Sequence, residues 1–291
     1  MEAAELTEQM IELIAEEIIS KQELSNLNIE FVKEQILKMF SENGKTSRRV
    51  LSKYEHCEGR YDQFRRSKEH DEVIKSIRAK LRRVYGVFIL DDYKKRYALL
   101  EELKKNDSLE MHNKILALHQ STKERLPYYS TVYPRIFQIT GRPKKIVDLA
   151  CGLNPISYPY LECSVKYLAC DLADEDLKFV DAYFKAKSIR GATLRVDLIK
   201  DDVSEITKDS DICFLFKTLD TLEAAKRNIS RELLKQIGSK FIAVSFATRS
   251  IGGGKAIRKE RRSWFEKILA KNHWSFEIFE LPNEVFYIIK R

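Results

Sequence analysis

The chain has 291 residues, 44% of them hydrophobic and 33% charged, a balance typical of a soluble globular protein with room for two modest domains. No apolar run reaches the roughly 18–20 residues that a membrane-spanning helix needs, and the acidic N-terminus lacks the basic start of a secretory signal. The five cysteines form no pairable framework and no CxxC pair, so we expect a reducing cytoplasmic location and no metal site.

The net charge of +8 is unevenly distributed along the chain. Residues 1–44 contain ten acidic residues and three lysines, a net charge of −7, whereas residues 45–83 contain thirteen Lys/Arg and six acids, a net charge of +7. A second basic block, residues 249–262, contains six Lys/Arg and one Glu, a net charge of +5. One such block can be a solvated helix face, but two blocks in different halves of the chain favour a polyanionic partner.

Apolar residues recur at helical spacing through the first 120 residues and predict an all-helical, basic domain over residues 1–120. The segment 41–47, rich in Ser, Asn and Gly, predicts a break between helices. In chain order, the predicted helices cover residues 6–18, 29–40 after a cap at Asn28, 69–88, 91–106 and 108–121.

After Gly141, short apolar strands alternate with helical stretches. This alternation predicts a parallel, doubly wound α/β sheet within a second domain over residues 121–291. A pair of strands joined through Pro282, Asn283 and Glu284 ends the chain, which places the last strand antiparallel to its neighbour. The predicted strands cover residues 145–151, 165–172, 192–198, 210–219 and 240–248, and the predicted helices cover residues 177–189, 222–238 and 259–273.

The stretch KKIVDLACGLNP, residues 144–155, has the pattern of a buried strand followed by a nucleotide-binding turn. A dinucleotide site would need G-x-G-x-x-G, so that a pyrophosphate lies against the backbone at a helix N-terminus. Here Gly152 is followed by Leu153, Asn154 and Pro155, and no Lys-Ser/Thr pair follows at P-loop spacing. The loop therefore predicts a nucleoside ligand without phosphates, and S-adenosylmethionine fits that description.

Acidic residues stand at the ends of the first three predicted strands, at Asp148, Asp171 and Asp197. A ligand of an open α/β sheet binds beyond the carboxyl ends of the strands, at the topological switch point. A carboxylate after the second strand can accept two hydrogen bonds from a ribose diol, so Asp171 is the candidate ribose ligand. Asp197 suits the adenine amino group, which is a donor. Each of these residues alone could instead be a turn or cap residue.

Several motifs occur in a fixed order and together resemble a known family. DLACGLNP, CDL, VDL, FLFKTLDTLE and VSFATRSIGG follow one another between residues 148 and 253, and STKERLPYYSTVY precedes them. They resemble the aminoglycoside-resistance methyltransferases that modify guanine N7 in the decoding site of small-subunit ribosomal RNA. The likeness covers roughly residues 121–255, with a looser match around residues 74–86.

The resemblance implies a Rossmann-like, S-adenosylmethionine-dependent methyltransferase fold, preceded by a helical domain that docks on the small ribosomal subunit. It implies that Arg125 holds the cofactor carboxylate, and that Phe216 and Lys217 line the methyl-transfer pocket as the catalytic candidates. The cofactor-binding candidates are Arg125, Ala150, Gly152, Asp171, Leu172, Asp197, Leu198 and Phe216. The RNA-binding candidates are Lys75, Arg78, Arg82, Arg83, Arg249, Ser250, Lys255 and Arg258.

Two departures from the family pattern fall on the substrate side. Ala247 stands where the family usually has proline, and the segment after Lys255 is more basic than usual. These departures leave the cofactor-binding motifs intact and bear on which base is the target. Either Phe246 or Trp264 could stack on an extruded base, although core packing is the commoner role of such residues.

Two other classes of function stay open at this point. A small-molecule methyltransferase would have no need for some thirteen clustered cations, and a non-enzymatic RNA-binding protein would not need the cofactor residues. A methyltransferase of a different RNA base or RNA is a further alternative. The sequence leaves the biological role and the oligomeric state open, with a monomer as the expectation.

Overall fold

The computed structural model describes residues 2–250, 255–257 and 262–291. The chain divides into two compact units, Met1–Val87 and Phe88–Arg291, and each is described by itself. None of the described helices is long and apolar enough to cross a membrane.

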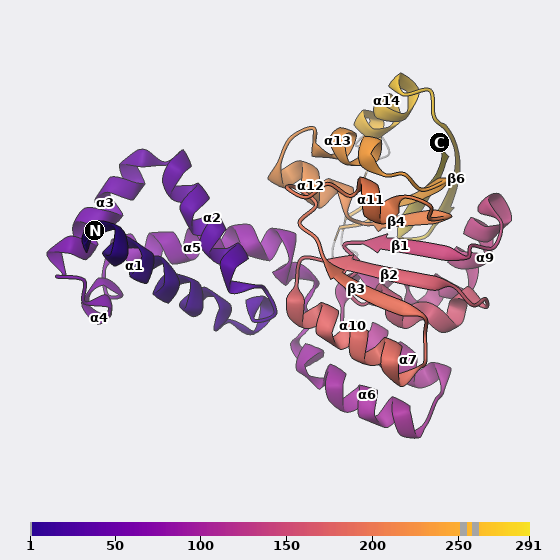
Figure 1. Cartoon of the computed structure of the whole chain (residues 1–291), viewed down its shortest axis with the longest axis horizontal. Coiled ribbons are helices and arrows are strands. Elements are labelled where there is room, and N and C mark those ends of the chain that lie inside the picture. The colour runs from indigo at the N-terminus through magenta and orange to yellow at the C-terminus, as the bar shows by residue number, and fades with distance from the viewer. Residues whose placement is uncertain (1, 251–254, 258–261) are drawn as a thin grey trace. The chain divides into compact units, whose positions relative to one another are not determined.

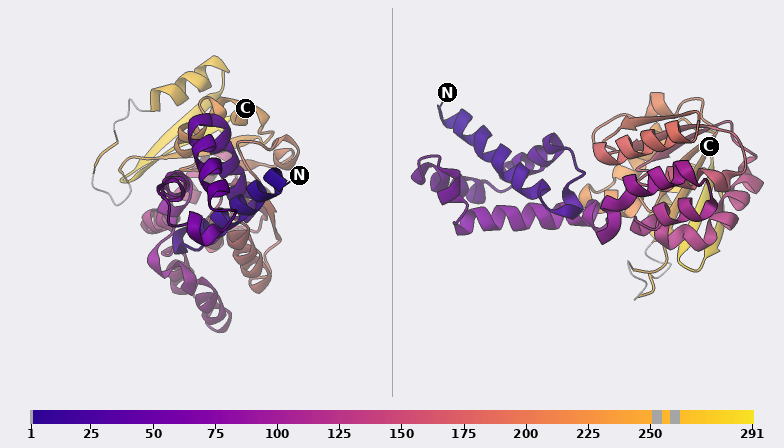
Figure 2. Two further views of the ribbon diagram at one scale, coloured as in Figure 1. Left: turned by 90° about the vertical axis from the view of Figure 1, so that its left-hand side faces the viewer. Right: turned by 90° about the horizontal axis from the view of Figure 1, so that it is seen from below.

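The described part of the first unit is helical, and α1, α2 and α5 pack against one another (Figures 1 and 2). The Asn28 side chain caps α2 by accepting hydrogen bonds from the amides of Glu30 (2.8 Å) and Phe31 (3.3 Å), as its sequence position predicts. Only Asn43 separates α2 from α3, so the predicted break over residues 41–47 is a single residue. The elements are α1 (Glu2–Ile19), η1 (Gln22–Leu24), α2 (Ile29–Glu42), α3 (Gly44–His56), α4 (Tyr61–Phe64), α5 (Lys68–Val84) and the junction turn η2 (Gly86–Phe88).

The second unit begins earlier than the predicted domain boundary at residue 120, because residues 88–120 pack on the α/β part of the chain. The Tyr93 hydroxyl donates a hydrogen bond to buried Asp176 at 2.9 Å, and Tyr97 meets Phe179 edge to face. The elements of this segment are η3 (Asp91–Lys95), α6 (Arg96–Lys105) and α7 (Leu109–Leu116). Helical periodicity finds such elements but does not show which body they join.

Seven strands form one sheet in the order β3-β2-β1-β4-β5-β7-β6 (Figure 1). Strands β1 to β5 are parallel, whereas β7 pairs antiparallel with both β5 and β6. The predicted doubly wound sheet with a C-terminal antiparallel hairpin is therefore confirmed. The strands are β1 (Lys145–Leu149), β2 (Lys166–Asp171), β3 (Gly191–Arg195), β4 (Ile212–Phe216), β5 (Phe241–Ala247), β6 (Ser275–Leu281) and β7 (Glu284–Lys290).

Helices cover both faces of the sheet, because alternate residues of each buried strand point to opposite sides. On one side, Leu233 of α13 and Phe265 of α14 join a core with Val147 and Leu215. On the other, Tyr133 of α9 stacks on Phe214. The helices of this region are α8 (Gln120–Arg125), η4 (Leu126–Tyr128), α9 (Tyr129–Thr140), η5 (Asn154–Leu161), α10 (Asp174–Ala186), α11 (Ser204–Thr207), α12 (Leu219–Ala225), α13 (Ile229–Gln236) and α14 (Ser263–Lys271).

One predicted helix is divided in the structure. Residues 222–238 form parts of two helices, α12 and α13, with Asn228 between them in the left-handed region at φ 66°. The Glu223 carboxylate accepts hydrogen bonds from the amides of Asn228 and Ser230, both at 2.8 Å, and so caps the new helix start. The prediction of one continuous helix was wrong because Glu223 satisfies the amides exposed by the break.

Candidate active site

The strand order reverses at β1, which lies between β2 and β4, and this reversal marks the expected binding crevice. Tight turns follow the strands there: Ala150 (φ 55°), Gly152 (φ 48°) and Lys217 (φ 56°) all adopt left-handed backbone conformations. Such positions cost on the order of 1–3 kcal/mol for residues other than glycine and are concentrated at ligand sites. The sequence-predicted loop and the Lys217 turn are thus the strained segments at this end of the sheet.

Asp171 ties the glycine turn to the end of β2. Its carboxylate accepts hydrogen bonds from the amides of Gly152 (2.8 Å), Leu172 (2.7 Å) and Ala173 (3.1 Å). Burial raises the pKa of Asp171, while these three amides act in the opposite direction. A carboxylate offers about four acceptor positions, so one is left on the oxygen that faces Gly152. That position suits a ribose hydroxyl.

Asp197 follows β3 and is held by its own turn. Its carboxylate accepts from the Ile199 amide at 3.0 Å, and its own amide donates to Asp201 at 2.7 Å. The next residue, Leu198, is buried, whereas Leu172 is partly exposed and Ala150 is exposed. The Asp197 carboxylate also lies 3.7 Å from the Lys200 ammonium, so these partners all come from its own turn, as in the turn role that the sequence left as an alternative.

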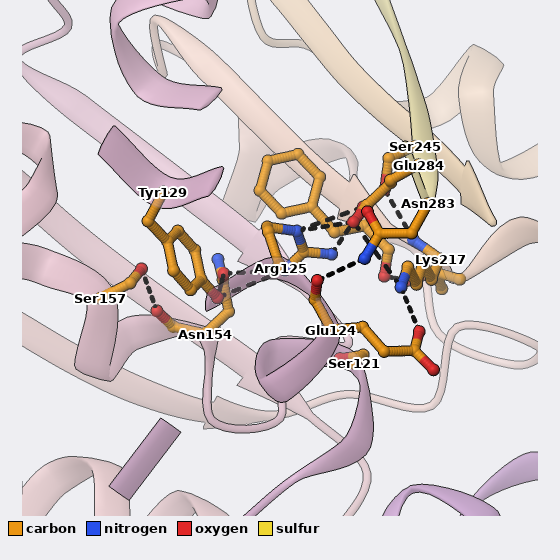
Figure 3. A network of polar contacts seen from close by, with 12 residues as sticks. Ser121, Glu124, Arg125, Tyr129, Asn154, Ser157, Lys217, Ser245, Asn283 and Glu284 are labelled. Atoms are coloured by element: carbon orange, nitrogen blue, oxygen red, sulfur yellow. Dashed lines mark hydrogen bonds and ion pairs between the residues drawn. The ribbon is translucent and has the colours of Figure 1, made fainter. Parts of the chain in front are cut away.

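Arg125 is the centre of a buried polar network (Figure 3). Its Nε donates to both Glu284 oxygens, at 3.1 and 3.2 Å, and its Nη2 donates to one of them at 2.7 Å. Nη1 donates to the Asn154 side-chain oxygen at 3.2 Å, and the Phe216 ring lies 4.7 Å from the guanidinium carbon. The cation that the family resemblance assigns to the cofactor carboxylate is therefore already paired with a carboxylate of the protein.

Lys217 joins the same network from the end of β4. Its ammonium lies 2.6 Å from the Glu124 carboxylate and 3.7 Å from that of Glu284 (Figure 3). Its amide donates to the Ser245 backbone oxygen (3.1 Å) and hydroxyl (3.0 Å), which fixes the strained turn to β5. The structure thus brings together Arg125, Phe216 and Lys217, as expected, and adds two carboxylates that sequence reasoning missed.

His119 is a further buried residue that sequence reasoning missed. Its ring stacks on Phe88 and lies against Gly152, where a Cβ atom would approach the ring to 3.1 Å. A side chain at Gly152 would therefore push the His119 ring away by a few tenths of an ångström and would also adopt a left-handed backbone conformation (φ 48°). Burial, together with the cations Arg125 and Lys217, lowers the pKa of His119 to about 3, so the ring is neutral at physiological pH.

The predicted RNA-binding residues of the first unit differ in whether their side chains already have partners within the protein. Arg78 donates to the Glu17 backbone oxygen at 2.7 Å, and Arg82 pairs with Glu23 at 2.6 Å, so both have structural partners. Lys75 lies 3.8 Å from Asp71 on an exposed helix face. The remaining candidate, Arg83, is exposed and has no ion-pair partner among the described residues.

The second basic block is described only in part. Arg249 and Lys255 are exposed, and the Ser250 amide donates to the Lys255 backbone oxygen at 2.7 Å. Arg258 lies outside the described residues. Phe246 is buried and meets Trp264, Phe265 and Tyr287 edge to face, so it belongs to the core and is not a stacking platform.

Among the described residues, no group of three or more His, Cys, Asp or Glu side chains could hold a metal ion. The features that remain are a strained glycine turn with an acid beside it, a buried Arg–Glu pair and a lysine flanked by carboxylates. They are compatible with a small nucleoside ligand carrying a charged end group.

Comparison with known proteins identifies what this arrangement is related to. The chain is 32% identical over 182 residues to a 16S rRNA (guanine(1405)-N(7))-methyltransferase of Frankia casuarinae, covering 62% of this chain and 63% of that protein. It is 30% identical over 230 residues to a protein of the same name from Micromonospora echinospora, covering 76% and 83%.

Solved structures agree with these relatives. The 16S rRNA methyltransferase RmtF, crystallised in complex with S-adenosyl-L-homocysteine, superposes with a TM-score of 0.77 at 25% identity over 97% of this chain and 98% of that chain. The 16S rRNA methylase RmtB has the same fold, with a TM-score of 0.69 at 21% identity over 97% of this chain and 98% of that chain. The family model for ribosomal RNA methyltransferase (FmrO) matches residues 63–288, and the chain belongs to this family of S-adenosylmethionine-dependent ribosomal RNA methyltransferases.

Proposed function

We propose that this protein transfers a methyl group from S-adenosylmethionine to a guanine N7 in the decoding region of small-subunit ribosomal RNA, within the assembled subunit. The observation that carries the proposal is the agreement between the activity named for the relatives and the chemistry of the site. The site combines a loop suited to a nucleoside without phosphates with a buried network of charged side chains. Because ribosomal subunits are its substrate, we expect it to act in the cytoplasm.

The residues at the switch point fit this cofactor. The turn at Ala150 and Gly152 lets a ligand approach the backbone, and Asp171 keeps one acceptor position for a ribose hydroxyl. Arg125 would hold the carboxylate of the amino-acid end, with Leu172, Asp197 and Leu198 beside the adenine. Because Glu284 already occupies one edge of the guanidinium, a ligand carboxylate has to share Arg125 with it.

The proposed reaction needs positioning and no general base. The cofactor supplies an electrophilic methyl group on a sulfonium, and guanine N7 carries a lone pair without a proton. Holding the two centres in line can contribute up to about 7–11 kcal/mol. The methylated guanine gains a positive charge, so the carboxylates of Glu124 and Glu284 would stabilise the product side of the reaction. Their pairing with Lys217 keeps that cation from opposing the developing charge.

The first unit would bring the RNA to this site through phosphate contacts. Arg83 is the candidate that the structure favours among those from the sequence, because Arg78 and Arg82 are held by internal partners. Arg66, just before α5, and Lys68, the first residue of α5, are also exposed and have no ion-pair partner in the described part of the chain. In the second unit, Arg249, Ser250 and Lys255, with Arg258, would lie near the substrate.

The experiment that tests the proposal follows methyl transfer from labelled S-adenosylmethionine to purified small ribosomal subunits. Wild-type protein should incorporate label, whereas Asp171→Ala should lose most of it at a fixed cofactor concentration. Lys178→Ala, which removes one member of an exposed ion pair on α10, is the matched control and should retain activity. Incorporation by the wild type into a small molecule instead of RNA would favour the metabolite alternative.

A further inference from the structure

The Asn154 side chain stands between two buried charges. Its Oδ1 accepts a hydrogen bond from Arg125 Nη1 at 3.2 Å, and its Nδ2 donates to Asp148 Oδ2 at 2.8 Å (Figure 3 shows Asn154 beside Arg125). All three side chains are buried, with exposed fractions of 0% for Arg125, 1% for Asp148 and 3% for Asn154. Asn154 thus connects the end of β1 to the guanidinium.

The chemistry of the two neighbours fixes the orientation of the amide. A carboxylate can only accept and a guanidinium can only donate, so Nδ2 has to face Asp148 and Oδ1 has to face Arg125. The Tyr167 hydroxyl donates to the same Asp148 oxygen at 2.6 Å, and the Tyr129 hydroxyl donates to the Asn154 oxygen at 2.9 Å. These contacts come from β2 and α9, and they leave the amide no second arrangement of equal energy.

The Arg125 guanidinium is consequently held from two sides. Glu284 takes the edge formed by Nε and Nη2, and Asn154 with Tyr129 takes Nη1. Of the five N–H groups of the guanidinium, one on Nη2 is left without a partner among the described residues. The direction of that N–H depends on the hydrogen bonds from both sides of the guanidinium. Of the residues that make them, only Asn154 belongs to the cofactor loop.

We propose that Asn154 is a positioning residue. Its amide is held by Asp148 and in turn holds Nη1 of Arg125, so that the guanidinium is directed toward the carboxylate end of the cofactor. This also gives a physical reason for an asparagine where nucleotide-binding loops usually continue with glycine. The inference rests on the proposed function, because it takes S-adenosylmethionine and its demethylated product as the ligands.

Two ligands separate positioning of Arg125 from general damage to the loop. S-adenosylhomocysteine contains the amino-acid carboxylate, whereas 5′-methylthioadenosine has the same nucleoside and lacks that end. In calorimetry, Asn154→Ala should weaken S-adenosylhomocysteine about tenfold or more, the effect of one lost hydrogen bond to a charged group. Binding of 5′-methylthioadenosine should change less than about threefold. Asp148→Asn allows the Asn154 amide to turn over. It should therefore also weaken S-adenosylhomocysteine more than 5′-methylthioadenosine, with a smaller loss of affinity than in Asn154→Ala.

Ser157→Ala is the matched control, because the Ser157 hydroxyl bonds the Asn154 backbone oxygen (2.6 Å) and Tyr133 (2.6 Å) without touching Arg125. It should affect both ligands equally. Equal losses for both ligands in Asn154→Ala, or no loss for either, would overturn the proposal. If Arg125→Lys shows no carboxylate-selective loss, the guanidinium does not read the carboxylate and the positioning role fails with it. Failure of the wild type to bind either ligand would instead refute the proposed function.

Discussion

Breaking the buried pair of Arg125 and Glu284 should strongly destabilise the second unit. Glu284→Leu removes the carboxylate that takes the Nε and Nη2 contacts of Arg125 and leaves a fully buried guanidinium without its counter-ion. Breaking a buried pair in this way costs about 3–5 kcal/mol. An exposed pair contributes about 0–1 kcal/mol. Both residues are 0% exposed, so the larger figure applies to this pair.

The assay is urea unfolding followed by tryptophan fluorescence. Both tryptophans of the chain, Trp264 and Trp274, lie in the second unit, so the signal reports on that unit. Arg125→Met combined with Glu284→Leu removes both charges and should recover most of the loss, because paired apolar replacements of buried ion pairs are often neutral. Lys185→Ala removes one member of an exposed pair and serves as the control. The reasoning is refuted if Glu284→Leu costs no more free energy of unfolding than Lys185→Ala.

Three other outcomes are expected. Asp171→Ala should weaken binding of S-adenosylhomocysteine by about 1–3 kcal/mol in calorimetry, and unchanged affinity would remove Asp171 from the ribose site. Charge reversal at Arg66, Lys68 and Arg83 should weaken subunit binding and lower its salt slope by about one per lost phosphate contact, while the same change at Lys178 should not. The neutral, buried His119 (pKa about 3, against an ordinary 6.5) makes stability rise with pH between about 3 and 6.5, because only the unfolded state binds the proton there. Burial raises the pKa of Asp148 from an ordinary 3.8 to about 6. Asp148 therefore makes stability fall with pH between about 4 and 6, since the folded state holds the extra proton there. Across that window, stability should therefore rise less with pH in His119→Gln than in the wild type, and urea midpoints with the same pH dependence in both proteins would contradict the assignment.

The fold was largely predictable because its signals are local. Buried strands such as residues 145–149 and the cap at Asn28 are visible in a few consecutive residues, and alternation of strands and helices determines the sheet type. The boundary between the two units differs from the predicted one because distant contacts decide it. Residues 88–120 have ordinary helical periodicity, and it is the packing of Tyr93 and Tyr97 on α10 that assigns them to the second unit.

The candidate site was predictable only where motifs carry it. Arg125, Asp171 and Lys217 lie in recognisable stretches, and the structure places Arg125 and Lys217 in one network. Glu284 comes from β7, 159 residues after Arg125, and no local pattern distinguishes it from any other acid in a terminal strand. His119 likewise looks ordinary in sequence, and its role against Gly152 depends on a turn that brings the two together.

The central claim is tested most directly by mapping the methylated nucleotide after reaction with intact small subunits and, in parallel, with a naked decoding-site hairpin at the same concentration. Two basic blocks, one in each unit, should gain from simultaneous contact with separate backbone tracts of the folded RNA. The account predicts a single guanine modified at N7 in the decoding region of intact subunits, with little or no transfer to the hairpin. Modification of another base, or equal initial rates on both substrates, would contradict it.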